Sequence, residues 1–214
     1  MRFSRTNGYE PTDPVYFDAD GDGDEDMAAP LSYADGNGVG THWYFWLWDA
    51  DTETPEQVPY PIAESSRCGA VIRSVTLKDG ALRVVQVLRD EYLFGQSCAD
   101  APTIVVTRRV AVEAGYPVAV GGVGGWGGLC PTFQATDVGY AASGPGAPSV
   151  YPAPSRDVKP LTGLDGVTLV EILSTVPEWL TRKGWRLYWL YDEKTDAPPY
   201  DEDGRYQPCA WLPE

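Results

Sequence analysis

The sequence predicts an all-β protein, and three observations lead to that prediction. The chain has 23 glycines and 19 prolines among its 214 residues, and they interrupt it too often for long helices. Short runs rich in β-branched and aromatic residues recur between these interruptions. Two pairs of such runs flank the tight-turn signals Lys78-Asp79-Gly80 and Glu113-Ala114-Gly115, which are typical of β-hairpins.

The predicted strands form two groups. The first group comprises residues 15–17, 42–49, 70–77, 81–89, 103–112 and 116–120, and the second comprises 149–151, 168–174, 184–191 and 205–212. A glycine-rich run over 120–129 and a proline-rich stretch lie between them. We therefore predict a β domain over residues 1–120, a Gly/Pro-rich connector over 121–148, and a second β domain over 149–214. The first domain is expected to be an antiparallel meander or sandwich.

The chain is acidic, with 31 Asp and Glu residues against 16 Lys and Arg and a net charge of −15. This charge repels nucleic acid phosphates, so we expect no nucleic acid partner. No run of 18 apolar residues is present, so we expect no membrane span.

The cysteine pattern predicts two disulfides. The four cysteines are Cys68, Cys98, Cys130 and Cys209, and none forms a CxxC pair. With a single histidine in the chain, a zinc site is not expected. Three pairings are possible, and we favour Cys68–Cys98 with Cys130–Cys209 because each pair then links one region. Disulfides imply an extracellular or cell-envelope location.

The aspartate-rich segment over residues 18–26 has the pattern of a calcium loop. Calcium takes 6–8 oxygen ligands, so alternating carboxylates must converge on one centre. The glycines Gly21 and Gly23 allow the positive φ angles that such a tight coil needs. The expected ligands are the side chains of Asp18, Asp20, Asp22 and Asp26. The backbone carbonyl of Asp24 is expected to supply one more oxygen. Without a cation, these carboxylates should raise one another's pKa.

The motif DxDGDGxxD, preceded by the aromatic run Val15-Tyr16-Phe17, resembles the calcium loop of FG-GAP/VCBS-type repeats. That resemblance implies a bound Ca²⁺ and a loop that joins two β-strands. The first nine residues are also similar to dockerin and EF-hand loops, but Ala29 stands where an EF-hand has its bidentate Glu. The motif occurs once, so it does not imply the propeller that several such repeats form.

The run HWYFWLWD over residues 42–49 is predicted to be an aromatic strand. Alternation places His42, Tyr44, Trp46 and Trp48 on one face and the other aromatic side chains on the opposite face. One interpretation is a central strand that is covered on both sides. The other is an aromatic surface for a sugar ring or a Pro-rich peptide, with Tyr44, Trp46 and Trp48 in contact with the ligand.

The C-terminal part combines a short opening strand, a run beginning Gly184-Trp185, and a closing run Cys209-Ala210-Trp211. This order resembles bacterial SH3-like domains and implies a small β-barrel that binds cell-wall or peptide ligands. The expected groove residues are Trp179, Tyr188 and Tyr200. The alternative is that these aromatic residues complete the barrel core.

No GxSxG, HExxH or Walker A motif is present. We therefore expect a secreted or cell-envelope binding or scaffolding protein that calcium stabilises and that recognises a protein or a cell-wall glycan. One alternative is a carboxylate-based polysaccharide hydrolase, which needs only two acidic residues. Another is an inhibitor or a subunit of a secreted protein assembly.

Overall fold

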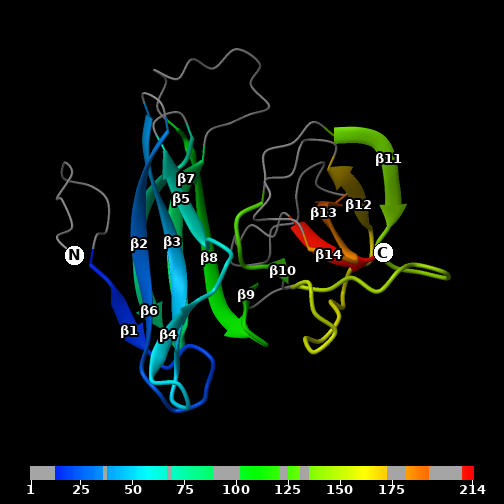
Figure 1. The fold of residues 1–214 in the computed structure, drawn as a ribbon. Helices are drawn as coiled ribbons and strands as arrows, with labels where there is room; N and C mark the ends of the chain where they lie inside the picture. Colours follow the sequence, from blue (N-terminus) through cyan, green and yellow to red (C-terminus); the bar gives the residue numbers. More distant parts are fainter. Residues whose placement is uncertain are drawn as a thin grey trace. The chain divides into compact units, whose positions relative to one another are not determined.

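The computed structural model describes residues 13–35, 38–66, 69–88, 102–120, 125–130, 135–172, 182–192 and 209–214. Within these ranges every regular element is a strand, which confirms the all-β prediction (Figure 1). The strands form three antiparallel sheets. No helix in the described part of the chain is long and apolar enough to cross a membrane.

The chain divides into two compact units, Met1–Val110 and Ala111–Glu214. The first sheet lies in the first unit and has the order β1-β2-β3-β4, with β5 also paired to β3. Its strands are β1 (Val15–Phe17), β2 (Asp26–Asp35), β3 (Gly38–Asp49), β4 (Thr54–Gln57) and β5 (Ala63–Ser66). The predicted domain limits at residues 120 and 148 stay predictions.

The second sheet has the order β10-β9-β8-β7-β6. Its strands are β6 (Val71–Lys78), β7 (Ala81–Leu88), β8 (Ile104–Glu113), β9 (Tyr116–Ala119) and β10 (Gly125–Trp126). Both predicted hairpins form. The turn residues have positive φ in each case, 51° and 72° at Asp79 and Gly80 and 50° and 77° at Ala114 and Gly115, as two-residue turns of type I′ require.

In the first unit, the first sheet packs one face against the second sheet. Trp43 and Phe45 of β3 are fully buried there, as are Ile72, Leu82 and Val84 of the opposite layer. Polar bonds also join the layers. The buried side chain of Arg108 donates to the backbone oxygen of Ile62 and, at 2.8 Å, to Oε1 of Gln86. Gln86 Nε2 in turn donates to the backbone oxygen of Glu64 at 3.0 Å. The N-terminal arrangement is therefore a sandwich.

The third sheet has the order β11-β12-β13-β14. Its strands are β11 (Ala135–Ala141), β12 (Val167–Ile172), β13 (Trp185–Asp192) and β14 (Cys209–Pro213). Val150 and Leu164 belong to a buried cluster with Leu169 and Leu190, and Trp126 packs edge-on against Trp211, which lies on the opposite face by strand register. Other segments of the unit thus cover both faces of this sheet.

The small SH3-like barrel expected at the C-terminus is not what the described strands form, because they make an open sheet. With both faces already covered, closing the sheet on itself would bury little further apolar surface. No strand forms over residues 149–151. Tyr151 instead makes an isolated antiparallel bridge with Trp211, through two backbone hydrogen bonds with N···O distances of 2.8 and 2.9 Å.

The disulfide Cys130–Cys209 is confirmed, with a Cα–Cα distance of 6.1 Å. It ties the segment that follows β10 to the first residue of β14. The partner pair Cys68–Cys98 lies outside the described residues. The segment predicted as a connector contributes β10 and β11, and Trp126 within it is fully buried.

The left-handed conformation of Ala114 yields a test of the second hairpin. Ala is strained in this conformation, whereas Asn adopts it more readily because its short polar side chain can hydrogen-bond to the local backbone. We expect Ala114→Asn to raise the free energy of unfolding by about 0.5–1 kcal/mol. The equivalent turn residue Asp79 already favours positive φ, so Asp79→Ala should change stability in the opposite direction. Urea denaturation measures both, and a loss of stability in Ala114→Asn would contradict the assigned turn.

Candidate metal centre

The loop between β1 and β2 brings three of the predicted carboxylates together. Asp18, Asp20 and Asp22 are exposed, and one oxygen of each lies within 4.8 Å of the others. Calcium binds oxygens at about 2.3–2.6 Å, so oxygens on opposite sides of the ion are about 5 Å apart. The Asp18–Asp20–Asp22 group could therefore hold a metal ion, and its carboxylate oxygens are of the kind that hard divalent cations prefer.

Backbone N–H groups hold these carboxylates toward the inside of the loop. Gly21 donates to Asp18 Oδ1 at 2.8 Å and Gly23 donates to Asp18 Oδ2 at 3.2 Å. The N–H of Asp22 donates to Asp20 at 3.2 Å. Gly21 and Gly23 have φ angles of 84° and 98°, which confirms the expectation that the coil uses glycine for positive φ.

Asp26 is placed differently from the other predicted ligands. It is 2% exposed and lies outside the Asp18–Asp20–Asp22 group. Its Oδ2 accepts the N–H of Ala19 at 2.8 Å, and its Oδ1 accepts the N–H of Trp48 at 2.8 Å. A buried carboxylate needs such donors to offset its lost hydration. Asp26 thus fastens the start of the loop to the end of β3.

The electrostatics of the loop favour a cation. Partial burial raises the pKa of Asp20, and the nearby carboxylates of Asp26, Asp22 and Asp18 raise it further, while the N–H of Asp22 opposes this shift. The direction agrees with the mutual repulsion expected from the sequence. A divalent ion among these oxygens would remove the repulsion.

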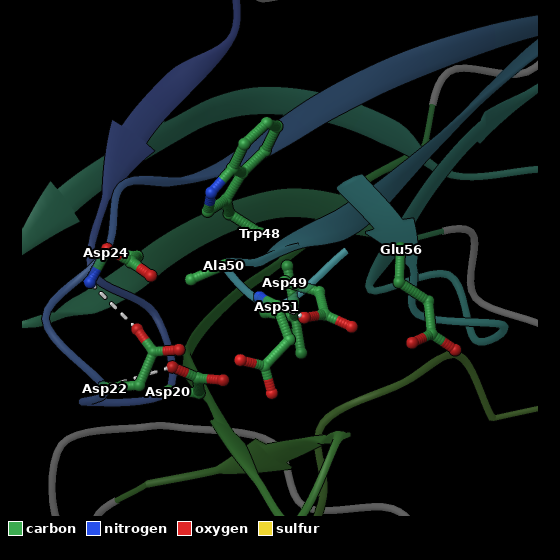
Figure 2. A pocket seen from close by; sticks show the side chains of 9 residues that line it. Asp20, Asp22, Asp24, Trp48, Asp49, Ala50, Asp51 and Glu56 are labelled. Atoms are coloured by element: carbon green, nitrogen blue, oxygen red, sulfur yellow. Dashed lines mark hydrogen bonds between the residues drawn. The ribbon is translucent and has the colours of Figure 1, made fainter. Parts of the chain in front are cut away.

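A shallow hollow of about 500 Å³ adjoins the loop. Figure 2 shows Asp20, Asp22 and Asp24 along one side of it and the β3–β4 hairpin along the other, with the indole of Trp48 directed away from these carboxylates. The hairpin contributes the carboxylates of Asp49, Asp51 and Glu56.

The β3–β4 turn is held by one of these carboxylates. Asp49 Oδ1 accepts the N–H groups of Asp51, at 2.9 Å, and of Thr52, at 3.2 Å. Contacts with Thr52 and then with the Asp51 N–H lower the pKa of Asp49.

The outer face of the first sheet carries an aromatic surface. Along β3 the inner residues Trp43 and Phe45 are fully buried, whereas Trp48 on the outer face is 38% exposed. Strand register places side chains of β1 and β2 in the same rows as those of β3. We call this surface the aromatic face, and its residues are Tyr16, Tyr33, His42, Tyr44, Trp46 and Trp48. The strand is therefore a core strand on one side only.

A polar cluster lies at the centre of the aromatic face. Tyr33 donates its hydroxyl to Glu64 Oε1 at 3.2 Å, and the hydroxyl of Tyr44 lies 3.3 Å from His42 Nδ1. His42 Nε2 is 3.8 Å from Glu64 Oε2, which is an ionic rather than a hydrogen-bonding distance. The contact with His42 lowers the pKa of Glu64, although burial opposes the shift. Burial and then Glu64 raise the pKa of Tyr44.

Packing also fixes the rings of this cluster. The Tyr33 ring lies over Gly40, where any Cβ would clash with it, and its centroid is 4.6 Å from that of His42. Sequence alternation within 42–49 identified only the β3 members of the face. Tyr16, Tyr33 and Glu64 were missed because they join it through strand pairing, which no local pattern reveals.

The predicted C-terminal groove is only partly described. Tyr188 is partly buried and packs against the hydrophobic cluster of the third sheet, in line with the core alternative for this residue. Trp179 and Tyr200 lie outside the described residues.

Comparison of the chain with protein-family models, curated proteins and solved structures finds no match in any of the three. The candidate site is therefore interpreted from its own geometry.

The role of Asp26 can be tested by Asp26→Asn. The new amide group would point a donor at a backbone N–H, which leaves one buried donor unsatisfied. We expect the free energy of unfolding to fall by about 2–3 kcal/mol in urea denaturation with EDTA present, so that no bound ion contributes.

Glu25→Gln is the matched control, because the adjacent Glu25 is exposed. It should change stability by less than about 0.5 kcal/mol. Equal effects of the two substitutions would show that Asp26 does not fasten the loop.

Proposed function

We propose that this chain is a calcium-stabilised carbohydrate-binding protein, and that a sugar polymer lies along the aromatic face. The observation that carries the proposal is the gathering of aromatic side chains from β1, β2 and β3 on one outward sheet surface. Within the aromatic face, Tyr16 is 55% exposed and Trp48 is 38% exposed, so a ligand can reach both rings. Large apolar groups held at a surface commonly mark an interaction site.

The chemistry of the aromatic face suits a sugar. A pyranose ring has apolar C–H faces that stack on aromatic rings, and its edge carries hydroxyls that need hydrogen-bond partners. The face offers both, since Tyr33, His42, Tyr44 and Glu64 place hydroxyl, imidazole and carboxylate groups among the rings. A protein partner, the other expectation from the sequence, requires no such alternation of rings and polar groups.

Calcium enters the proposal through the Asp18–Asp20–Asp22 group and the likeness of the loop to FG-GAP/VCBS-type repeats. An ion bound only by the folded chain would stabilise it by mass action. The bond from Trp48 N–H to Asp26 would connect that stabilisation to the aromatic face. Calcium modules outside cells bind with dissociation constants of about 10⁻⁴–10⁻³ M. With the Cys130–Cys209 disulfide, this supports an extracellular or cell-envelope location.

Calcium should raise the melting temperature of the wild-type chain and EDTA should lower it. At a free calcium concentration one hundred times Kd, the expected stabilisation is about 2.7 kcal/mol. Asp20→Asn keeps an oxygen for the N–H of Asp22 but removes a charged ligand, so it should abolish most of the shift. Glu25→Gln should retain it. A wild type whose melting temperature does not respond to either reagent would disprove the calcium site.

Carbohydrate binding can be tested by electrophoresis through gels that contain soluble polysaccharides of neutral, acidic and amino sugars. We expect at least one polymer to retard the wild type, and Trp48→Ala to weaken that retardation about tenfold because stacking area is lost. Leu77→Ala is the control, since Leu77 is an exposed apolar side chain of the second sheet. Unaltered migration of the wild type in every gel would refute the proposed function.

A further inference from the structure

We infer that the outer face of the second sheet binds a phosphate dianion between Arg83 and Arg109. Strand register sets these two residues, which we call the arginine pair, directly opposite each other on β7 and β8. The site is separate from the aromatic face, which belongs to the first sheet. It therefore adds a second binding activity that does not depend on the proposed function.

The arginine pair points away from the sandwich core. Along β7, Arg83 lies between Leu82 and Val84, which are fully buried, and along β8 Arg109 precedes Val110, which is also fully buried. Successive side chains of a strand point to opposite faces, so both arginines lie on the outer face of the sheet. Both are partly exposed, so a ligand in solvent can reach them.

The pair brings like charges together without a protein counter-ion. Side chains directly opposite in an antiparallel pair have Cβ atoms about 4.5–5.5 Å apart, and like charges there destabilise the sheet. Lys78 lies diagonal to Arg83, because Thr76 pairs with Arg83, and it adds a third positive charge. None of the ion pairs among the described residues involves Arg83, Arg109 or Lys78. The adjacent turn contributes one carboxylate, that of Asp79, so the cluster stays cationic in a chain whose net charge is −15.

The side chain of Arg109 is already held in place and has an unused donor. Its Nη2 donates to the backbone oxygen of Asp79 at 3.2 Å, which fixes the guanidinium over the β6–β7 hairpin. Its Nε is buried and has no hydrogen-bond acceptor among the described residues. A buried donor without an acceptor is unfavourable. An oxyanion beside this guanidinium would supply acceptors that the protein does not.

Charge and geometry favour a phosphate over other anions. A guanidinium is a planar fork that binds a carboxylate or a phosphate through two parallel hydrogen bonds. A carboxylate has one charge and would serve one fork, and a phosphodiester also has only one charge. A phosphate monoester has three terminal oxygens and nearly two charges at neutral pH, so it matches both arginines. The exposed hydroxyl of Thr76, in the same row as the arginine pair, offers a further donor.

Titration calorimetry with glucose 6-phosphate and glucuronate tests this inference. The full chain is used at mildly alkaline pH and constant low ionic strength, without added calcium because calcium phosphate is insoluble. Both probes carry the same sugar ring, so any contribution of the aromatic face is common to them. We expect glucose 6-phosphate to bind at least about tenfold more tightly than glucuronate. Inorganic phosphate distinguishes the sources: tighter binding than glucose 6-phosphate would support the site with the free ion as its ligand, and weaker binding would support it with a phosphorylated molecule.

Single substitutions locate the site. Arg83→Gln and Arg109→Gln should each weaken the binding of glucose 6-phosphate about tenfold, because each removes one fork. Arg156→Gln is the matched control, since Arg156 is an exposed arginine of the second compact unit, and it should leave the affinity unchanged.

Arg83→Glu separates a lost site from a lost fold. It places opposite charges across the strands, so the melting temperature without phosphate should rise by about 1–3 °C. Phosphate should raise the melting temperature of the wild type, because it binds the folded chain, and should no longer raise that of Arg83→Glu.

Three results would overturn the inference. Equal affinity for glucose 6-phosphate and glucuronate would show that no dianion is selected. Equal effects of Arg83→Gln and Arg156→Gln would place the binding elsewhere. A lower melting temperature of Arg83→Glu in the absence of phosphate would show that the two charges do not repel each other across the strands. The polysaccharide gels test the aromatic face independently of all three.

Discussion

The N-terminal architecture depends on one buried carboxylate. Asp26 begins β2, and its two oxygens accept N–H groups from Ala19 in the loop and Trp48 at the end of β3. Each bond satisfies a charge that burial would otherwise make costly. Since the bonds lead to two different segments, the position of the acidic loop and the end of the aromatic strand are set by the same group.

The character of the aromatic strand follows from its place in the sheet. One face of β3 packs into the sandwich, where Trp43 and Phe45 lose all contact with solvent. On the other face, the residues of the aromatic face keep part of their surface in solvent. Cores bury aromatic rings because of the large apolar area that is removed from water. Rings left outside the core are therefore the ones that can bind a ligand.

The sequence was most informative where a pattern is local. The two hairpins were predicted because Asp79-Gly80 and Ala114-Gly115 carry the turn signal themselves, and the coil of the acidic loop because Gly21 and Gly23 alternate with aspartates. Contacts between distant segments were not predictable. Asp26 was expected among the metal ligands, because nothing in its neighbourhood shows that it would pair with the backbone of Trp48. The C-terminal barrel failed for the same reason, since Trp126 packs against Trp211 and Val150 joins the cluster that holds Leu212, and both contacts join residues far apart in sequence.

The acidic side chains of the chain do not all lie in the same environment. Around the hollow, acidic side chains occupy three distinct situations. Asp26 is buried and bonded to the backbone, the Asp18–Asp20–Asp22 group is drawn together by backbone N–H donors, and Asp51 and Glu56 are exposed on the β3–β4 hairpin. Identical carboxylates thus have different chemistry according to the donors around them: the first has its hydrogen bonds satisfied, the second suits a divalent ion, and the third is hydrated by solvent. Solubility alone would explain the net charge but would not require the backbone bonds that order Asp26 and the Asp18–Asp20–Asp22 group.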